Sequence, residues 1–205
     1  VGGGGRFPAG DAMTRRALDS YYTPAWQPRV LLAHQEISGT VLESCAGDGG
    51  VAKVIDGHGR DVILNDLSYH DAPVFDGHTA FALGAEDRML YRMCGPVDWV
   101  VTNPPYQMPL CRDIVAQAVK HARVGVAMLL RLSFLEPTAK VNPRGPWLER
   151  HPPTRILILP RYSYTQDGKS DSCTTAWMIW LIGAAVRRRY SQEQTILCLH
   201  NADVM

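Results

Sequence analysis

The sequence has no membrane-length hydrophobic run and almost no net charge, and both absences narrow its function. Its longest apolar run, around 176–186, is shorter than the about 20 residues that a membrane-spanning helix needs. That run predicts a buried strand, and we expect no membrane partner. The formal net charge is only +1, so the chain as a whole is not attracted to polyanions. This argues against tight, unassisted binding to duplex nucleic acid.

Motifs that form disulfides or bind metals are also missing. The five cysteines are odd in number and far apart, with no C-x-x-C pair, which excludes a disulfide framework and a zinc site. The seven histidines show no ligand spacing, so we predict no metal. Such cysteine usage is typical of a reducing compartment, and we expect the protein in the cytoplasm. The cysteines are Cys45, Cys94, Cys111, Cys173 and Cys198.

The chain does contain short apolar runs, rich in β-branched residues, that alternate with helical stretches. Hydrophobic residues make up 46% of it, enough for a sizeable core in one domain. Apolar residues at helical spacing predict a helix between 106 and 124. Because such strands are covered on both faces, we expect a doubly wound α/β domain with a mostly parallel sheet. The expected strands lie at 40–45, 62–64, 97–102, 125–132, 155–159 and 174–182, with one more around 195–199.

Polar and proline-rich stretches interrupt this pattern. Residues 1–12 predict a disordered leader, and 13–205 form the single expected domain. The segment 136–153 holds five prolines and is expected to be a surface loop. Residues 165–172 contain Gly168 and are expected to form a mobile loop. Nothing in the sequence indicates a separate target-recognition domain.

The first predicted strand runs into a glycine-rich turn, Glu43-Ser44-Cys45-Ala46-Gly47-Asp48-Gly49-Gly50. Glycines allow close backbone approach to a ligand, and N–H groups at the start of the following helix face it. No lysine followed by serine or threonine accompanies the turn, which favours a cofactor whose polar ends are not phosphates. Asp66 follows the second strand, 19 residues after Gly47, where a carboxylate can accept ribose hydroxyl protons. The alternative is an ordinary turn, with Asp66 capping a helix.

A second motif, Asn103-Pro104-Pro105-Tyr106, follows the apolar strand that ends at Thr102. Open α/β sheets bind ligands at the carboxyl ends of their strands. The prolines stiffen the backbone and remove two N–H donors, so that the carbonyls of Asn103 and Pro104 are held as acceptors. With the Asn103 side-chain oxygen they can accept hydrogen bonds from an amino group, and Tyr106 offers a ring for stacking. The alternative is a rigid turn without chemistry.

Together these motifs resemble the N6-adenine DNA methyltransferases, a class I Rossmann-like family with a seven-stranded, mostly parallel sheet. The resemblance covers residues 21–180, and the motif order is similar to that of the gamma class and of small enzymes from bacteriophages and mobile elements. It implies methyl transfer from S-adenosylmethionine to the exocyclic amino group of adenine in DNA. The setting it implies is restriction-modification or its evasion, in a bacterial or phage-infected cytoplasm. Asn103, Pro104, Pro105 and Tyr106 become the catalytic residues.

The resemblance also implies a cofactor site. Residues 21–26 are similar to the segment that packs over the methionine end, Asp66 to the ribose acid and Asp87 to the adenine-site acid. A surface carboxylate is the alternative for Asp87. The implied cofactor residues are Tyr22, Thr23, Pro24, Trp26, Glu43, Cys45, Ala46, Gly47, Asp48, Gly49, Asp66, Leu67, Glu86, Asp87 and Asn103.

Two departures from the family bear on the substrate. Cys45 stands where many methyltransferases have the first glycine of the turn, although Cys-Ala-Gly-Asp-Gly is a familiar variant in this family. Gamma enzymes also carry a recognition domain that has no counterpart here, so specificity is low or comes from 136–153, a partner chain or dimerisation. An extruded base needs a second aromatic partner opposite Tyr106. The first candidate for this aromatic is Tyr164, followed by Tyr162 and Phe134. Arg161 and Lys169 are the candidates for phosphate contacts. Four more arginines are expected on the same rim, or alternatively on a solvated face without a role: Arg131, Arg144, Arg150 and Arg155.

Other substrates fit the same motifs. Methylation of adenine in structured RNA or of a glutamine amide in a protein can use an Asn-Pro-Pro-Tyr site. A non-catalytic module that binds S-adenosylmethionine and assists a partner enzyme is the alternative from another class. The sequence leaves monomer and homodimer equally open.

Overall fold

The computed structural model describes residues 23–67, 78–136, 144–161, 173–183 and 196–199. Several expectations lie outside the described residues: the leader at 1–12, the loop at 165–172, and the side chains of Tyr22, Tyr162, Tyr164 and Lys169.

The described strands form one sheet of eight, in the order β3-β2-β1-β4-β5-β7-β6-β8. Only β7 runs antiparallel to its neighbours β5 and β6; the other pairs are parallel. The predicted mostly parallel α/β sheet is confirmed, with one strand more than the seven expected. The strands are β1 (Val41–Glu43), β2 (Val62–Asn65), β3 (Ala80–Phe81), β4 (Trp99–Thr102), β5 (Gly125–Arg131), β6 (Arg155–Ile158), β7 (Thr175–Leu181) and β8 (Ile196–Cys198).

Strand β8 pairs parallel to β6, where the sequence indicated a last strand around 195–199. The strand that has no counterpart among the predicted ranges is β3, which is only two residues long. β3 ends at Phe81, and Asp87 lies six residues further on, where its carboxylate caps helix α4 (Arg88–Cys94). Of the described helices, none is both long and apolar enough to cross a membrane.

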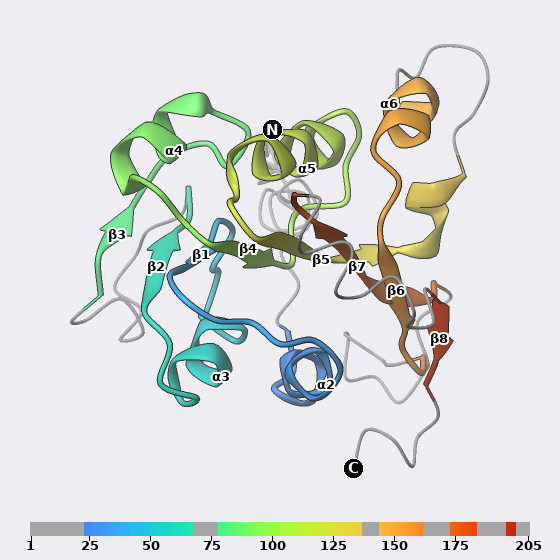
Figure 1. The fold of residues 1–205 in the computed structure, drawn as a ribbon, viewed down its shortest axis with the longest axis horizontal. Coiled ribbons are helices and arrows are strands. Elements are labelled where there is room, and N and C mark those ends of the chain that lie inside the picture. Colours follow the sequence, from blue (N-terminus) through green and yellow to red (C-terminus); the bar gives the residue numbers. More distant parts are fainter. Residues whose placement is uncertain (1–22, 68–77, 137–143, 162–172, 184–195, 200–205) are drawn as a thin grey trace, which may run out of the picture.

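Helices cover both faces of the sheet (Figure 1). Helices α2 (Trp26–His34) and α3 (Ala52–Asp56) lie on one side, and α4 and α5 (Leu110–His121) on the other. Strands β1, β2 and β4 are buried at every residue, as expected for strands covered on both faces.

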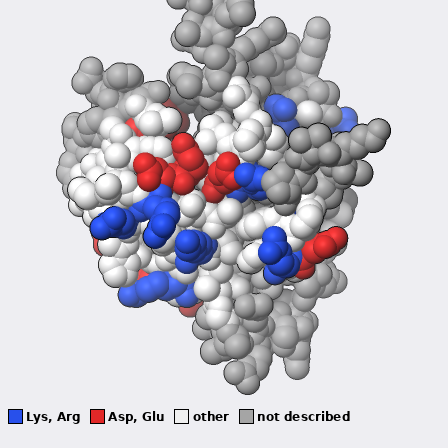
Figure 2. Space-filling model, turned by 90° about the horizontal axis from the view of Figure 1, so that it is seen from above, with Lys and Arg blue, Asp and Glu red and all other residues white. Residues whose placement is uncertain are grey.

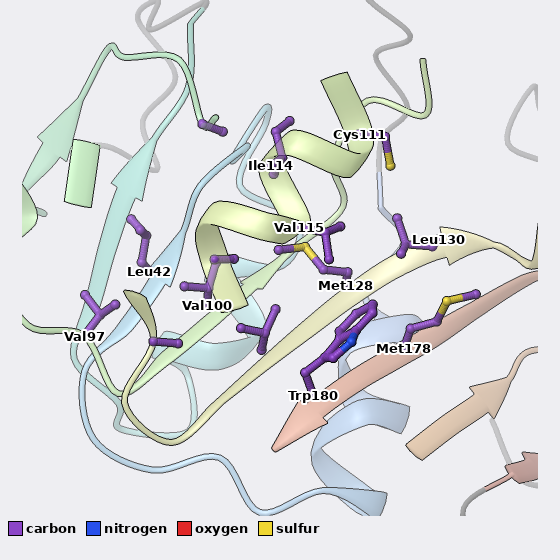
Figure 3. Packing of buried hydrophobic residues seen from close by; sticks show 14 of the residues in the cluster. Leu42, Val97, Val100, Cys111, Ile114, Val115, Met128, Leu130, Met178 and Trp180 are labelled. Carbon is purple, nitrogen blue, oxygen red and sulfur yellow. The ribbon is translucent and has the colours of Figure 1, made fainter. Parts of the chain in front are cut away.

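Helix α5 is the main cover of the second face. It buries Cys111, Ile114, Val115 and Ala118, which recur at helical spacing and so form one apolar stripe. Figure 3 shows Ile114 and Val115 pointing down toward the strands, over side chains such as Val100 and Met128. Helix α5, which follows the Asn-Pro-Pro-Tyr motif in the chain, therefore packs on strands β4 and β5.

The proline-rich segment is more regular than predicted. Residues 144–150 form helix α6, and the 3-10 helix η2 (Leu132–Leu135) precedes the segment. Pro146 falls in the first turn of α6, where the missing N–H would have no partner in the helix. Pro152 and Pro153 follow its end. The prolines therefore delimit a short helix within the segment that was expected to be a surface loop.

Two arginines expected on the binding rim are buried. Arg155, at the start of β6, donates to the carbonyl of His34 at 2.7 Å and to Gln35 Oε1 at 3.3 Å. It lies at the amino end of its strand, away from the edge where the motifs gather. Arg144 is 6% exposed and donates to the carbonyl of Glu136 at 2.8 Å. Each guanidinium thus ties chain segments together, and neither is on a solvated face.

Candidate functional site

The predicted motifs meet at one edge of the sheet because the four strands that carry them are parallel neighbours. The glycine-rich turn follows β1, Asp66 follows β2, Asn103 follows β4, and Arg131 ends β5. The carboxyl ends of parallel strands share an edge, which is where open α/β sheets bind ligands.

The turn after β1 is tied to the end of β2. Gly47 and Gly49 have φ angles of 52° and 76°, in the left-handed region that favours glycine. The Gly47 N–H donates to Asp66 Oδ2 at 2.8 Å, and the Ala46 N–H to the carbonyl of Asn65 at 2.9 Å. A Cβ placed on Gly47 would have no atom within 4 Å, so the surface above this residue is open to a ligand.

Asn65 was missed in the sequence analysis, and it holds three segments together. Its buried amide nitrogen donates to the carbonyls of Ser44 at 2.8 Å and Leu83 at 2.9 Å, and its oxygen accepts from the Leu83 N–H at 3.0 Å. The available signal was a polar residue within the apolar strand β2, directly before Asp66. Asn65 therefore fixes the carboxylate-bearing end of β2 against the turn.

Glu43 ends β1 beneath the turn and is 1% exposed. Burial raises the pKa of its carboxyl well above the ordinary value; the Ala52 N–H lowers the pKa, and the charges of Asp48 and Asp66 raise it. Its Oε2 atom is buried without a hydrogen-bond partner among the described residues. Burial therefore favours the protonated form of this carboxyl, and Oε2 remains for a further hydrogen bond.

Cys45 joins the glycine-rich turn to the end of β4. Its N–H donates to Thr102 Oγ1 at 3.0 Å, and that hydroxyl donates to the Cys45 carbonyl at 3.4 Å. Desolvation raises the pKa of the Cys45 thiol, as does the charge of Asp66. The sulfur is therefore a protonated thiol that is poorly suited to act as a nucleophile.

The amide of Asn103 is held from both sides. Its Nδ2 donates to Thr23 Oγ1 at 3.1 Å, and its Oδ1 accepts from Tyr106 Oη at 2.8 Å. These contacts orient the amide so that Oδ1 faces Tyr106. A carbonyl oxygen has two lone pairs, so this atom can accept a second hydrogen bond. Pro104 is buried and Pro105 half-buried, which leaves the tetrapeptide firmly packed.

Thr23 connects Asn103 to the glycine-rich turn. It is 9% exposed, and a Cβ added to Gly50 would lie 2.4 Å from its carbonyl oxygen. The segment before α2 thus packs against the turn, and Gly50 permits that close approach. Pro24 accepts from the Gln27 N–H at the start of α2, and Trp26 packs against the core. The contact between Thr23 and Asn103 was not foreseen.

The remaining predicted cofactor residues make separate local contacts. Asp48 is exposed and its Oδ1 accepts from the Gly50 N–H at 3.1 Å. Leu67 is 66% exposed. Asp87 accepts from the Met89 N–H at 2.8 Å as the cap of α4, and Glu86 beside it is half-buried.

Tyr106 has a cation above its ring. The guanidinium carbon of Arg131 lies 4.8 Å from the ring centroid, so one face of the ring is in contact with that side chain. Phe134, the third choice for a base-stacking aromatic, is 2% exposed and packs edge-on against Trp180 at 6.5 Å. Arg161 is exposed at the end of the described segment after β6.

The described residues contain no group of three histidine, cysteine, aspartate or glutamate side chains placed to hold a metal ion. Their cysteines are free thiols. The charge on the surface is mixed: Figure 2 shows acidic side chains near the middle of the side that carries α4 and α5, with basic side chains in separate groups around them.

Comparisons with known proteins place the fold. No family model and no curated protein matches the chain. Solved structures do match. A candidate RNA methyltransferase from Pyrococcus horikoshii is 18% identical, with a TM-score of 0.58 over 80% of this chain and 88% of that one. A candidate class I S-adenosylmethionine-dependent methyltransferase from Listeria monocytogenes is 11% identical, with a TM-score of 0.59 over 86% of this chain and 64% of that one.

The M protein of the type I restriction enzyme EcoKI is 16% identical, with a TM-score of 0.55 over 82% of this chain and 45% of that protein. The chain therefore spans less than half the length of that M protein. Identities this low bear on the fold alone. With the strand order described above, they show that the chain has the class I, Rossmann-like methyltransferase fold.

Proposed function

We propose that this protein transfers a methyl group from S-adenosylmethionine to the N6 amino group of adenine in DNA. The observation that carries the proposal is the amide of Asn103, held between Thr23 and Tyr106 at the edge that also carries the glycine-rich turn. An oriented acceptor beside a stacking ring suits a planar amine, and the turn suits a nucleoside cofactor.

The residues at the turn fit S-adenosylmethionine, which supplies an electrophilic methyl group on a sulfonium sulfur. The surface above Gly47 is open, and a carboxylate at Asp66 is suited to ribose hydroxyls. The unpartnered oxygen of Glu43 is available to a donor beneath the turn. The lysine next to the turn, Lys53, donates to the carbonyl of Asp48 at 2.9 Å, so it is not placed as the phosphate-binding lysine of a nucleotide loop.

The chemistry requires positioning more than acid–base catalysis. Asn103 Oδ1 uses one lone pair for Tyr106 Oη, and its second lone pair accepts an N6 proton of adenine. The carbonyl of Pro104 is the acceptor for the other proton. Two such hydrogen bonds draw positive charge away from the nitrogen and leave its lone pair more available. These dipoles are fixed before the reaction, so they stabilise developing charge without reorganisation.

DNA is the favoured polymer because the order of motifs resembles that of adenine-specific DNA enzymes, and the EcoKI M protein shares the fold. RNA is the second candidate, favoured by the similarity to the Pyrococcus horikoshii structure. A formal net charge of only +1 makes the chain a poor unassisted binder of either duplex, which favours a single-stranded or locally opened substrate.

The test is transfer of labelled methyl groups from S-adenosylmethionine to separate pools of unmethylated DNA, RNA and protein, followed by nucleoside and amino-acid analysis. We expect N6-methyladenine in the DNA pool. Label confined to RNA or to protein would overturn the substrate. No transfer to any pool, with cofactor binding intact, would favour a partner-dependent subunit instead.

A further inference from the structure

A cavity of about 310 Å³ adjoins the catalytic tetrapeptide and is assigned to neither the cofactor nor the target amine. Tyr106 forms part of its wall. This volume lies at the small end of the range for ligand pockets, roughly 300–1,000 Å³. It suits one compact planar group better than a peptide segment. The other lining residues are Met108, Cys111, Leu130, Arg131, Ser133, Phe134, Glu136 and Arg144.

The cavity wall contains two arginines that are each placed over an aromatic ring. Arg131 lies over Tyr106 with 4.8 Å between guanidinium carbon and ring centroid, and Arg144 lies over Phe134 at 5.5 Å. Arg144 is further held by its hydrogen bond to the Glu136 carbonyl. Guanidinium groups and aromatic rings are the surfaces on which nucleobases stack and phosphates are held.

The charges of the lining also match one phosphodiester. Two guanidinium groups and the carboxylate of Glu136 leave a net charge of +1 in a chain whose whole sequence carries only +1. Part of the lining is apolar, formed by Met108, Cys111, Leu130 and Phe134. Apolar side chains for a base and guanidinium groups for a phosphate together complement a nucleotide.

We propose that this cavity is a second nucleotide subsite, which binds the nucleotide adjacent to the target adenine in the same strand. The inference rests on the proposed function, because the shared wall at Tyr106 places the cavity next to the target base. The neighbouring base lies against the apolar part of the lining, and Arg131 holds the phosphate. The enzyme thereby senses its sequence context with residues of the catalytic domain itself.

The experiment measures binding of single-stranded oligonucleotides by fluorescence anisotropy, with a central adenine and either a normal or an abasic neighbour on each side. Three variants are compared with wild type. Arg131→Met removes the cation, Ser133→Tyr fills the cavity from an exposed position, and Arg29→Met removes an exposed arginine on α2 as the matched control. Cofactor binding is measured by calorimetry for each.

We expect wild type to bind the normal oligonucleotide about tenfold more tightly than the one with the relevant abasic neighbour. Ser133→Tyr should lose this difference and retain cofactor binding. Arg131→Met should weaken binding and reduce the slope of log K against log salt by roughly 0.7, the value for one contact to a single strand. Arg29→Met should match wild type.

Two results would overturn the subsite alone. In the first, Ser133→Tyr and Arg131→Met bind every oligonucleotide as Arg29→Met does. In the second, filling the cavity abolishes discrimination of an abasic target and leaves discrimination of the neighbour intact, which would assign the cavity to the target base. If wild type methylates DNA in either case, the proposed function survives. A third result, in which wild type binds no oligonucleotide and methylates protein instead, would overturn both the subsite and the proposed function.

Discussion

At the scale of single residues, Asn103 is fixed by partners on both ends of its amide, Thr23 at the nitrogen and Tyr106 at the oxygen. Replacing Asn103 with Ala removes one preorganised acceptor, and we expect turnover to fall by roughly 10²-fold or more. Gln107→Ala, a change at an exposed position in the same loop, is the control and should leave turnover near normal. The measurement is single-turnover methyl transfer with saturating cofactor. Near-normal turnover of Asn103→Ala would refute its role.

Thr23 is expected to act through Asn103 as a positioning residue. Thr23→Val keeps the shape but loses the hydroxyl that accepts from Asn103, a hydrogen bond worth about 1 kcal/mol. Turnover should fall about fivefold to tenfold, and Thr23→Ser should restore it. Because Thr23 also packs on the cofactor turn, the dissociation constant of S-adenosylmethionine is measured in parallel. A change confined to that constant would show that Thr23 serves the cofactor alone.

Glu43 should make stability depend on pH in an unusual direction. Its carboxyl pKa is raised in the folded state, chiefly by burial, so the folded protein holds this proton more tightly than the unfolded chain does. The contribution to stability is complete below the unfolded pKa of about 4.3 and decreases as pH rises above it.

Glu43→Gln should therefore be increasingly stable relative to wild type as the pH is raised from about 4.5 to 8. Urea denaturation of both proteins across that range gives the difference in free energy of unfolding. If the two stability curves run parallel, the carboxyl is not held neutral by its surroundings.

At the scale of elements, the junction of β4 and β5 leaves no room beside Trp99. A Cβ on Gly125 would lie 2.5 Å from Trp99 Cζ3, and Trp99 is 1% exposed, so the ring has little space to yield. Gly125→Ala should reduce the free energy of unfolding by roughly 1–3 kcal/mol through overpacking. Urea denaturation measures the change.

Gly84→Ala is the matched control, because the nearest atoms to its new methyl group belong to the flexible carboxylate end of Glu86, the closest at 2.9 Å. We expect a change of less than about 0.5 kcal/mol there. Equal losses in the two variants would mean that the general cost of adding a methyl group, and not the Trp99 contact, sets the effect.

Elements could be predicted where a contiguous stretch of sequence carries a clear hydrophobic pattern. Strands β1, β4, β5 and β7 are continuous apolar runs, and α5 has a clear helical stripe, so their places follow from spacing. β3 is two residues long and only half-buried, which leaves no periodic signal to read. Helix α6 was hidden by its flanking prolines, because composition does not reveal whether a proline lies inside a helix or at its start.

At the scale of the whole molecule, the formal net charge of only +1 bears on substrate preference. Extruding a base from a duplex costs a few kcal/mol, and a chain with so little net positive charge gains little from phosphate contacts to offset that cost. We therefore expect methylation of single-stranded DNA to be at least about tenfold more efficient than that of the matching duplex. Values of kcat/KM on both forms at one salt concentration test this, and a preference for the duplex would contradict it.

The candidate site was predictable in its motifs and not in its contacts. The glycine-rich turn and the Asn-Pro-Pro-Tyr tetrapeptide are contiguous in sequence, so their residue types alone indicate chemistry. The contacts of Asn103 with Thr23 and of Thr102 with Cys45 join residues 80 and 57 positions apart. Only the strand order brings them together. For the same reason the burial of Arg144 and Arg155 could not be judged from their positive charge.

The sheet described above ends on both sides in very short strands, with β3 at one edge and β8 at the other. An edge strand is a template on which another chain can add by backbone hydrogen bonding, and its hazard grows with its length. Edge strands of two and three residues offer an incoming strand few backbone hydrogen bonds. At high concentration, the described part of this protein should therefore resist aggregation by edge-to-edge strand pairing.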